Sequence, residues 1–211
     1  MDRKKENISK AVIKRLPKYH RYLNELLNNK VDRISSKELG EKIGFTASQI
    51  RQDLNCFGDF GQQGYGYNVE ALYEEICGIL GLGKDYKMVV VGCGNIGQAV
   101  INYDNFRKLG FDICGIFDKN PKLVGLKIRD EEVMDIEKLE GFLKNNHVDI
   151  GIICVNKENA QRICDTMVAG KVKGIWNFAP ADLVVPENIK VENVHLSDSL
   201  LTLSCVLNDV E

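Results

Sequence analysis

Long apolar runs are absent from this sequence of 211 residues. No segment approaches the roughly eighteen uninterrupted apolar residues of a membrane-spanning helix, and no apolar core of a signal peptide follows the stretch from Met1 to Asn7. We therefore expect a cytoplasmic protein without a membrane partner. Apolar residues make up 44% of the chain, which is enough to form a packed core.

The seven cysteines include no CxxC pair, and an odd number cannot pair completely. Most of them lie inside apolar runs, which is typical of reduced, buried side chains. We interpret them as small hydrophobic residues and predict no metal site.

The small net charge of −2 conceals an uneven distribution along the chain. Residues 1–68 contain 13 Lys and Arg against 8 Asp and Glu, a balance of +5, so the other 15 and 22 give −7 for residues 69–211. A polyanion would bind at the positive end.

The N-terminal third predicts three helices followed by a glycine-rich hairpin. Pro17 should kink or restart the first helix. The second helix opens at Ser36 and closes at Gly44, and Thr46 is a good N-cap for the third. The third helix has an apolar face and a polar face, formed respectively by Ala47, Ile50, Leu54 and Phe57, and by Ser48, Arg51, Gln52 and Asn55.

Glycines alternate with aromatic residues between Gly58 and Tyr67, as a tight β-hairpin or wing requires. Residues 69–82 then predict a linking helix that stops at Gly81 and Gly83. We place the domain boundary there. The expected domains are a winged helix-turn-helix domain with its linking helix at 1–82 and a second domain at 83–211.

Strands and helices alternate in the second domain, which predicts an α/β fold with a Rossmann-type, doubly wound parallel sheet. Strands are expected at 88–91, 113–117, 148–155, 174–178 and 189–194, and helices near 95–109, 135–145 and 157–169. A terminal helix over 200–207 is apolar on more faces than a surface helix needs. We expect it to pack on a second chain.

A GxGxxG pattern follows the first of these strands and opens a helix; its residues are Gly92, Cys93, Gly94, Asn95, Ile96 and Gly97. Such glycines allow a tight turn, a close approach to a pyrophosphate and close packing of helix on strand. Asp118 ends the second strand, where it can bind ribose hydroxyls and repel the 2′-phosphate of NADP(H), although Lys119 tempers that repulsion. NAD(H) is favoured over coenzyme A or a turn that binds nothing.

An NAD-dependent dehydrogenase with an accessory helical domain is the alternative function, and it needs a positioned acid or base near the carboxyl ends of the strands. His20 lies in the basic domain and His147 precedes a strand, so only His195 could face the cofactor. Little chain is left for a separate substrate-binding domain. We therefore predict cofactor binding without turnover, and no catalytic residue.

The polar face of the third helix suits the major groove of DNA, where arginine can bind guanine and glutamine can bind adenine. We predict DNA contacts from this helix and from the wing; the residues are Thr46, Ser48, Gln49, Arg51, Gln52, Asn55, Gln63 and Tyr65. The alternative is a dimerisation or protein-binding module whose polar face is merely solvated. The charge of +5 disfavours that alternative.

Several blocks in combination resemble one family, the redox-sensing transcriptional repressor Rex. They are Ile13 to Pro17, Ile34 to Gly40, Thr46 to Leu54, Gly64 to Tyr67, the glycine pattern, Asn177 to Pro180 and Val191 to Val194. The resemblance implies a homodimer with a swapped C-terminal helix that binds inverted-repeat operator DNA and is released by NADH. We accordingly expect further NAD(H) contacts from Tyr103, Val155, Phe178, Ala179 and Pro180.

The resemblance also implies a switch that includes Arg21 and Tyr103. The family's usual partner for them is an aspartate after the last strand, where this chain has His195. Many relatives have lysine in place of Gln52 and a basic residue in place of Gln63, so the operator is expected to differ in detail. A competing sensor is Cys93, because a position at a helix N-terminus can lower the pKa of a thiol.

Overall fold

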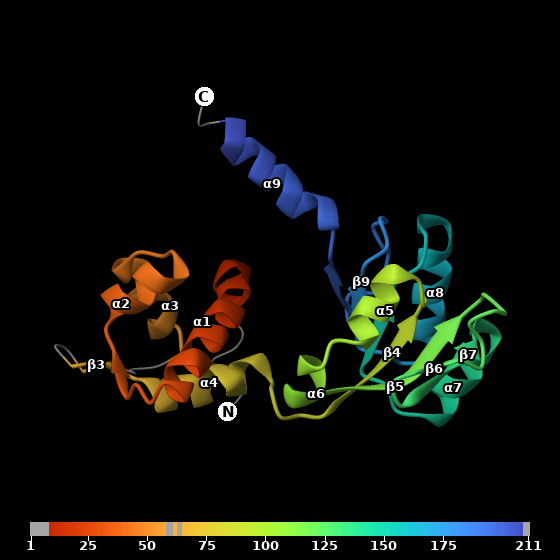
Figure 1. Cartoon of the computed structure of the whole chain (residues 1–211), viewed down its shortest axis with the longest axis horizontal. Coiled ribbons are helices and arrows are strands. Elements are labelled where there is room, and N and C mark those ends of the chain that lie inside the picture. The colour runs from red at the N-terminus through yellow and green to blue at the C-terminus, as the bar shows by residue number, and fades with distance from the viewer. Residues whose placement is uncertain (1–8, 58–60, 63–64, 209–211) are drawn as a thin grey trace. The chain divides into compact units, whose positions relative to one another are not determined.

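The computed structural model describes residues 9–57, 61–62 and 65–208 of the chain. The chain divides into two compact units, Met1–Lys84 and Asp85–Glu211 (Figure 1). Each unit has its own hydrophobic core. The first unit is mainly helical and the second is an α/β sheet, which confirms the predicted fold class.

The first unit combines helices with a small antiparallel sheet whose strand order is β1-β3-β2. Its elements are α1 (Lys10–Asn28), β1 (Arg33–Ile34), α2 (Ser36–Ile43), α3 (Ala47–Asn55), β2 (Gly61–Gln62), β3 (Gly66–Asn68) and α4 (Val69–Leu80). α2 and α3 form the helix-turn-helix pair. β2 and β3 pair as the predicted wing.

Side chains cap the N-termini of α1 to α4. Each capping residue accepts a hydrogen bond from the backbone N–H three positions later; the four caps are Ser9, Ser35, Thr46 and Asn68. Glu38 completes a reciprocal capping box with the cap of α2, and Gly44 ends that helix in the left-handed conformation. The predicted ends of α2 and the predicted cap of α3 are confirmed.

One core fills the space between the helices of this unit. Ile50 of α3 and Ile76 of α4 are fully buried in it. α1 runs through Pro17 as a single helix, so the restart that the sequence allowed does not occur. Leu16 and Tyr19 flank the proline and are almost completely buried, and their packing outweighs the helical hydrogen bond that proline removes.

The second unit contains a sheet with the strand order β10-β9-β8-β4-β5-β7-β6. Its strands are β4 (Tyr86–Val91), β5 (Phe111–Asp118), β6 (Lys127–Ile128), β7 (Glu131–Asp135), β8 (Ile150–Ile153), β9 (Gly174–Asn177) and β10 (Lys190–Asn193). Neighbouring strands are parallel except for the edge strand β6, which is antiparallel to β7. The order reverses between β4 and β8, as in doubly wound dinucleotide-binding sheets.

Helices cover both faces of this sheet (Figure 1). They are α5 (Asn95–Ile101), α6 (Asn105–Lys108), α7 (Leu139–Asn145) and α8 (Lys157–Ala169). Alternate residues of β4 enter different cores: Val89 and Val91 pack with residues of α7 and α8, whereas Met88 and Val90 pack with residues of α5. Burial on both faces explains the nearly uninterrupted apolar strand.

Two helix predictions in this unit were wrong in extent. The helix expected near 95–109 is divided, because α5 ends at Ile101 and α6 begins at Asn105. The helix expected near 135–145 starts as α7 only at Leu139, after β7 and a 3-10 turn over Ile136–Lys138. The hairpin of β6 and β7 was not predicted, because its short edge strand is rich in charged residues and lacks an apolar alternation.

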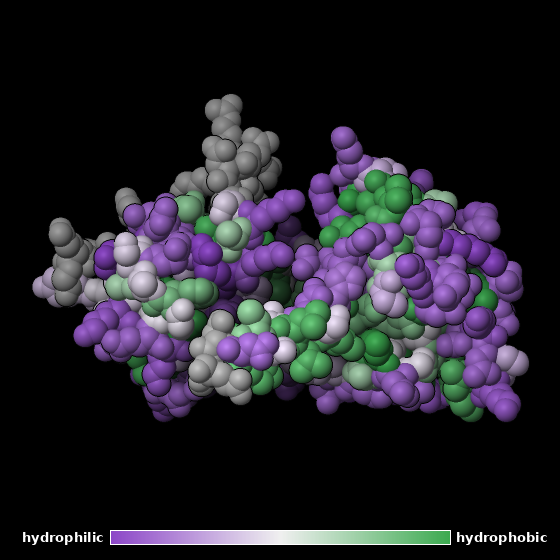
Figure 2. Space-filling view, turned by 90° about the horizontal axis from the view of Figure 1, so that it is seen from above, coloured by the Kyte–Doolittle hydropathy of each residue, from purple (hydrophilic) through white to green (hydrophobic). Residues whose placement is uncertain are grey.

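α9 (Leu196–Asn208) is the last described element and has no buried residue. Large apolar side chains are exposed along it, including Leu200, Leu201, Leu203, Val206 and Leu207. Figure 2 shows uncovered hydrophobic groups on a mostly hydrophilic exterior. Among the helices of the described residues, none has both the length and the apolar character needed to span a bilayer.

Candidate functional site

The glycine pattern forms a tight turn between β4 and α5. Gly92 has a φ of +99°, and a Cβ there would collide with the carbonyl oxygen of Cys154 on the neighbouring strand's loop. A Cβ on Gly97 would overlap the carbonyl oxygen of Gly92. These two positions therefore require glycine for steric reasons, and they hold α5 directly against the end of β4.

Gly94 differs from these two glycines because a Cβ there would meet nothing within 4 Å. Packing within the chain does not explain a glycine at this position. Gly94 is the N-cap of α5 and has no side chain to cap the helix, so the first amides of α5, beginning at Asn95 and Ile96, are available to a bound anion. The open space at Gly94 fits the close approach of a pyrophosphate.

Asp118 ends β5 beside this turn. Its Oδ2 accepts a hydrogen bond from the backbone N–H of Cys93 at 2.5 Å, and its Oδ1 accepts one from that of Asn120 at 2.7 Å. The carboxylate thus ties the end of β5 to the glycine turn. It lies where a ribose of a dinucleotide would bind next to the pyrophosphate.

A cavity of about 320 Å³ opens beside this turn. Its lining comes from the ends of β4 and β5, the turn after β7, the loop after β8 and the first half of α8: Val91, Gly92, Asp118, Lys119, Ile136, Glu137, Cys154, Val155, Asn156, Asn159, Arg162 and Ile163. Gly92, Asp118 and Val155 were predicted cofactor contacts. The residues from α8 were missed, although their position just after the strand at the switch point was a usable signal.

The cysteines next to the turn are poor nucleophiles. Cys93 is fully buried, and burial together with the negative charge of Asp118 raises the pKa of its thiol to about 12. Burial and the neighbouring Cys93 raise the pKa of Cys154 to about 12 as well. These shifts oppose the alternative of a Cys93 thiolate sensor, because a thiol with such a pKa stays protonated at neutral pH.

An aromatic series connects α6 and the residues before it with β9. Ring centroids are 4.7 Å apart between Tyr103 and Phe106, 5.6 Å between Phe106 and Trp176, and 4.7 Å between Trp176 and Phe178. Tyr103 is 51% exposed at the outer end of the series. Two predicted cofactor residues, Tyr103 and Phe178, are thereby joined on one side of the sheet.

Asn177 holds the loop after β9, which carries the other predicted contacts. This amide is fully buried; its Nδ2 donates to the Ala181 carbonyl and to Asn193, and its Oδ1 accepts from the backbone N–H of Ala179. Ala179 is buried by the same turn, whereas Pro180 is exposed. The amide fixes the path of the loop toward the carboxyl end of the sheet.

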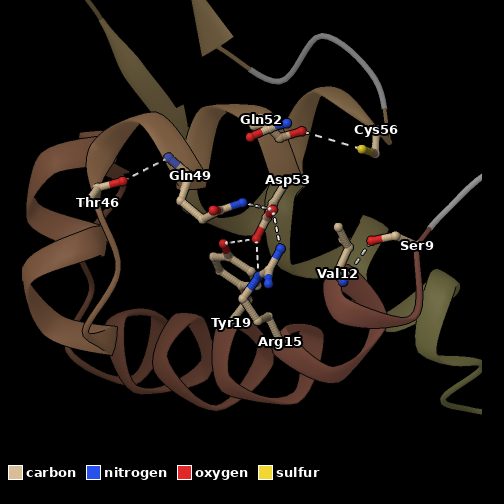
Figure 3. A network of polar contacts seen from close by, with 9 residues as sticks. All are labelled: Ser9, Val12, Arg15, Tyr19, Thr46, Gln49, Gln52, Asp53 and Cys56. Atoms are coloured by element: carbon tan, nitrogen blue, oxygen red, sulfur yellow. Dashed lines mark hydrogen bonds and ion pairs between the residues drawn. The ribbon is translucent and has the colours of Figure 1, made fainter.

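The helix-turn-helix unit exposes the polar face of α3. The predicted DNA contacts exposed on this helix are Thr46, Ser48, Arg51, Gln52 and Asn55. The Arg51 Nη1 donates to the Ser36 hydroxyl at 3.1 Å. Gln49 is half-buried and turned inward, since its Nε2 donates to Asp53 at 2.8 Å (Figure 3).

The wing contributes one described residue to the predicted interface. Tyr65 is 70% exposed, and its carbonyl accepts a hydrogen bond from Arg33 at 3.4 Å. Gln63 lies outside the described residues.

The predicted switch residues lie in different units. Arg21 is exposed on α1 of the first unit. Tyr103 and His195 belong to the second unit, where His195 is half-buried between β10 and α9 and its carbonyl accepts from the Asp198 N–H at 3.1 Å.

None of the three histidines, which all belong to the described residues, lines the cavity. His147 precedes β8 at the opposite edge of the sheet, where its Nε2 lies 3.0 Å from Asp149. His20 is in the first unit, stacked on Tyr73. Among the described residues, no group of His, Cys, Asp and Glu side chains is arranged to hold a metal ion.

Comparison with known proteins finds matches over both units. A family model described as putative DNA-binding protein N-terminus matches residues 7–55, and another described as CoA binding domain matches residues 83–181. The redox-sensing transcriptional repressor Rex of Clostridium kluyveri is 68% identical over 211 residues, covering 100% of both chains. The Rex repressor of Clostridium acetobutylicum is 69% identical over 98% of this chain and 97% of its own.

Solved structures give the same result. RSP in complex with beta-NAD+ and operator DNA has a TM-score of 0.91 and 61% identity, covering 97% of this chain and 94% of that one. RSP in complex with beta-NADH has a TM-score of 0.88 and 58% identity, covering 97% and 96%. With such identity over its whole length, and with a helix-turn-helix unit joined to a dinucleotide-binding sheet, the chain belongs to the Rex family of redox-sensing transcriptional repressors.

Proposed function

We propose that this chain is a homodimeric transcriptional repressor that binds inverted-repeat operator DNA in the cytoplasm and is released by NADH. The observation that carries the proposal is the match to RSP over 97% of the chain, because RSP was solved with operator DNA and NAD+ and also with NADH. The two units supply the two kinds of surface that such a regulator needs. One exposes a polar helix face, and the other builds a dinucleotide turn.

We assign DNA binding to residues 1–82, with α3 in the major groove. Arg51 and Gln52 read base edges, Ser48 and Asn55 flank them, and the phosphate backbone is contacted by Thr46, Tyr65 and Gln63. Gln49 is left out of this interface because its side chain is bound to Asp53.

We assign NAD(H) binding to residues 83–211. The pyrophosphate lies over Gly94 and the surrounding turn, and the adenosine half lies in the cavity with Asp118 and Val155. The nicotinamide half extends toward Tyr103, Phe178, Ala179 and Pro180. NADH acts as a reversible ligand here, and the chain supplies binding and a change of conformation.

The switch rests on two dimer geometries. NADH shifts the population toward the geometry that separates or rotates the recognition helices, and it does so only by its preference for that state. Each tenfold loss of operator affinity requires about 1.4 kcal/mol of coupling. Arg21, Tyr103 and His195 form the contacts that differ between the two states, and α9 packs on the second chain, which covers its exposed apolar residues.

The chain acts as a regulator without turnover. The alternative is a dehydrogenase, which lacks support because His195 is the sole histidine of the three near the carboxyl ends of the strands and no partner acid or base is hydrogen-bonded to its ring among the described residues. Steady oxidation of NADH with a 2-oxo acid or an aldehyde would support the dehydrogenase instead.

Fluorescence anisotropy on a labelled inverted repeat tests the proposal, with half-sites about one DNA turn apart and a fixed salt concentration. Binding is expected without ligand and with NAD+, and NADH is expected to release the DNA. Coenzyme A serves as a competitor because one matching family model bears its name. Release by coenzyme A and not by NADH would contradict the assignment of the ligand.

Two variants separate the two surfaces in this assay. Arg51→Ala is expected to abolish specific operator binding and to retain NADH binding. Tyr103→Phe is expected to keep operator binding and to weaken the response to NADH. Unchanged operator affinity in the first variant, or a full NADH response in the second, would remove that residue from its role.

A further inference from the structure

A fully buried carboxylate lies between α1 and the recognition helix α3. Asp53 belongs to α3, and its exposed fraction is 0%. A charge removed from water destabilises the fold unless it is paired and hydrogen-bonded. The surroundings of this aspartate therefore have to supply donors.

Four donors converge on this carboxylate (Figure 3). The Arg15 guanidinium of α1 donates from Nε to Oδ2 at 2.6 Å and from Nη2 to Oδ1 at 2.7 Å. The Tyr19 hydroxyl, also of α1, donates to Oδ2 at 2.8 Å, and Gln49 of α3 donates to Oδ1 at 2.8 Å. Each carboxylate oxygen thus accepts two hydrogen bonds, and the arginine is bound by both arms of its fork.

The titration behaviour agrees with this geometry. Burial alone would raise the pKa of Asp53, but hydrogen bonds from Arg15, Gln49 and Tyr19 and the arginine charge lower it below its ordinary value. The same contacts raise the pKa of Arg15. The pair is therefore ionised throughout the neutral range.

The network is directional, whereas the apolar core around it is not. Ile50 and Leu54 of α3 are buried against the common core, and apolar packing of this kind tolerates small rotations. A two-armed guanidinium–carboxylate contact is lost when either helix turns or slides. Arg51 and Gln52 sit on the exposed side of the same short helix, so a rotation of α3 would move both.

We propose that Asp53, held by Arg15 and Tyr19, is a positioning residue that fixes the rotation of the recognition helix α3 on α1. This inference rests on the proposed DNA-binding function and adds to it a determinant of operator specificity that does not touch DNA. α1 also carries Arg21 of the proposed switch. The network makes α1 and α3 move as one body, so displacement of α1 is passed directly to the DNA-reading side chains.

The test variant is Asp53→Asn in the full-length chain, which keeps the size of the side chain and removes its charge. The measured quantity is the ratio of affinity for the operator to affinity for a scrambled duplex of the same length and salt. We expect operator affinity to fall at least about tenfold, since correctly aligned base contacts supply specificity. Affinity for the scrambled duplex should stay equal or rise, because binding there depends on charge.

The matched control is Ile76→Val, which trims the same core on α4 away from the network. It lowers stability without removing a polar contact, so its specificity ratio should equal that of the wild type. An unchanged ratio in folded Asp53→Asn would overturn the proposal. An equal loss of the ratio in Ile76→Val would also overturn it, because a general loss of stability would then explain both.

Tyr19→Phe keeps the test decisive if Asp53→Asn does not fold. It removes one donor and leaves the ion pair, so a smaller loss of the ratio in the same direction is expected, and a wild-type ratio would contradict the proposal. NADH binding, followed by its fluorescence, should remain at the wild-type level in every variant. If the wild type itself fails to bind the operator, the proposed function fails, and the result is then distinct from failure of the positioning role.

Discussion

Different kinds of contact stabilise the interior of each of the two units. In the first unit, side chains cap α1 to α4, and a buried ion-pair network joins α1 to α3. In the second unit, the structure shows no side-chain cap hydrogen bond at the N-termini of α5 to α8, and close backbone packing at Gly92 and Gly97 fixes the central turn. Side-chain caps and an ion-pair network thus fix the helices of the first unit, whereas steric fit fixes the glycine turn of the second.

At α5 and α8, the absence of a side-chain cap agrees with the ligand that the second unit is proposed to bind. Helix ends in the first unit are completed within the chain, which leaves the α3 side chains to contact a partner. The N-termini of α5 and α8 lie at the dinucleotide turn and the cavity, through Gly94 and Asn156 respectively. Amides left without a side-chain partner there are available to an anionic ligand.

Substitutions in the glycine turn should cause the largest losses of stability and of NADH binding. Gly97→Ala places a Cβ on the Gly92 carbonyl oxygen, so the backbone has to move, and we expect a loss of about 4 kcal/mol or more in stability together with the loss of NADH binding. Gly94→Ala meets no atom of the chain and should lose NADH binding with little change in stability. Urea unfolding followed by Trp176 fluorescence, with NADH titration, distinguishes the two. Equal stability of both variants would contradict the steric account.

The variant Arg15→Ala tests how much the ion-pair network contributes to the stability of the first unit. It leaves a buried carboxylate without its ionic partner, and we expect a loss of about 3 kcal/mol. Trp176 is the sole tryptophan and lies in the second unit, so the unfolding transition seen by its fluorescence should stay in place while circular dichroism shows earlier loss of helix. A shift of both signals together would mean that the units do not unfold independently.

Low pH should reduce the difference in stability between the wild type and Arg15→Ala. The folded-state pKa of Asp53 is below its ordinary value, so the network stabilises the fold fully above about pH 4 and loses this contribution as the pH falls through the lower folded-state pKa. Burial without the arginine charge raises the pKa of Asp53, so the stability gap between wild type and Arg15→Ala should narrow progressively as the pH falls from neutral through about pH 4. A gap of constant size down to pH values near about 2 would show that the arginine acts through packing alone.

Local patterns in the sequence predicted many of the helix ends and the glycine turn. Features that depend on contacts between residues far apart in the sequence were not predicted. Gly44 and Thr46 mark helix ends by their own chemistry, and the glycine turn is a contiguous pattern. Asp53 was passed over because its partners Arg15 and Tyr19 are more than thirty residues away, which no periodicity reveals. The break between α5 and α6 likewise depends on tertiary packing, whereas the α8 lining of the cavity could have been inferred from its position after the switch-point strand.

Removing a helix-cap side chain should give a smaller difference in stability loss between the two units. Thr46→Ala removes an acceptor for the Gln49 amide and should cost about 1 kcal/mol. Asn156 occupies the same position in α8 but makes no cap hydrogen bond, so Asn156→Ala should change stability by less than about 0.5 kcal/mol. Chemical unfolding at neutral pH measures both. A similar loss for the two variants would show that the capping contrast has no energetic meaning.

The smallest effect is expected for chemical modification of Cys93. Its reactivity in the second unit can be compared with that of Cys56 in the first. A helix N-terminus favours a thiolate, but burial and the Asp118 charge act against it and raise the pKa of Cys93 to about 12. Cys56 of the first unit is exposed. Iodoacetamide at neutral pH followed by mass spectrometry should therefore label Cys56 and leave Cys93 unmodified until the chain unfolds, and peroxide should not change operator binding through Cys93. Rapid labelling of Cys93 in the folded protein would mean that the turn opens, and the steric account of Gly92 and Gly97 would fail with it.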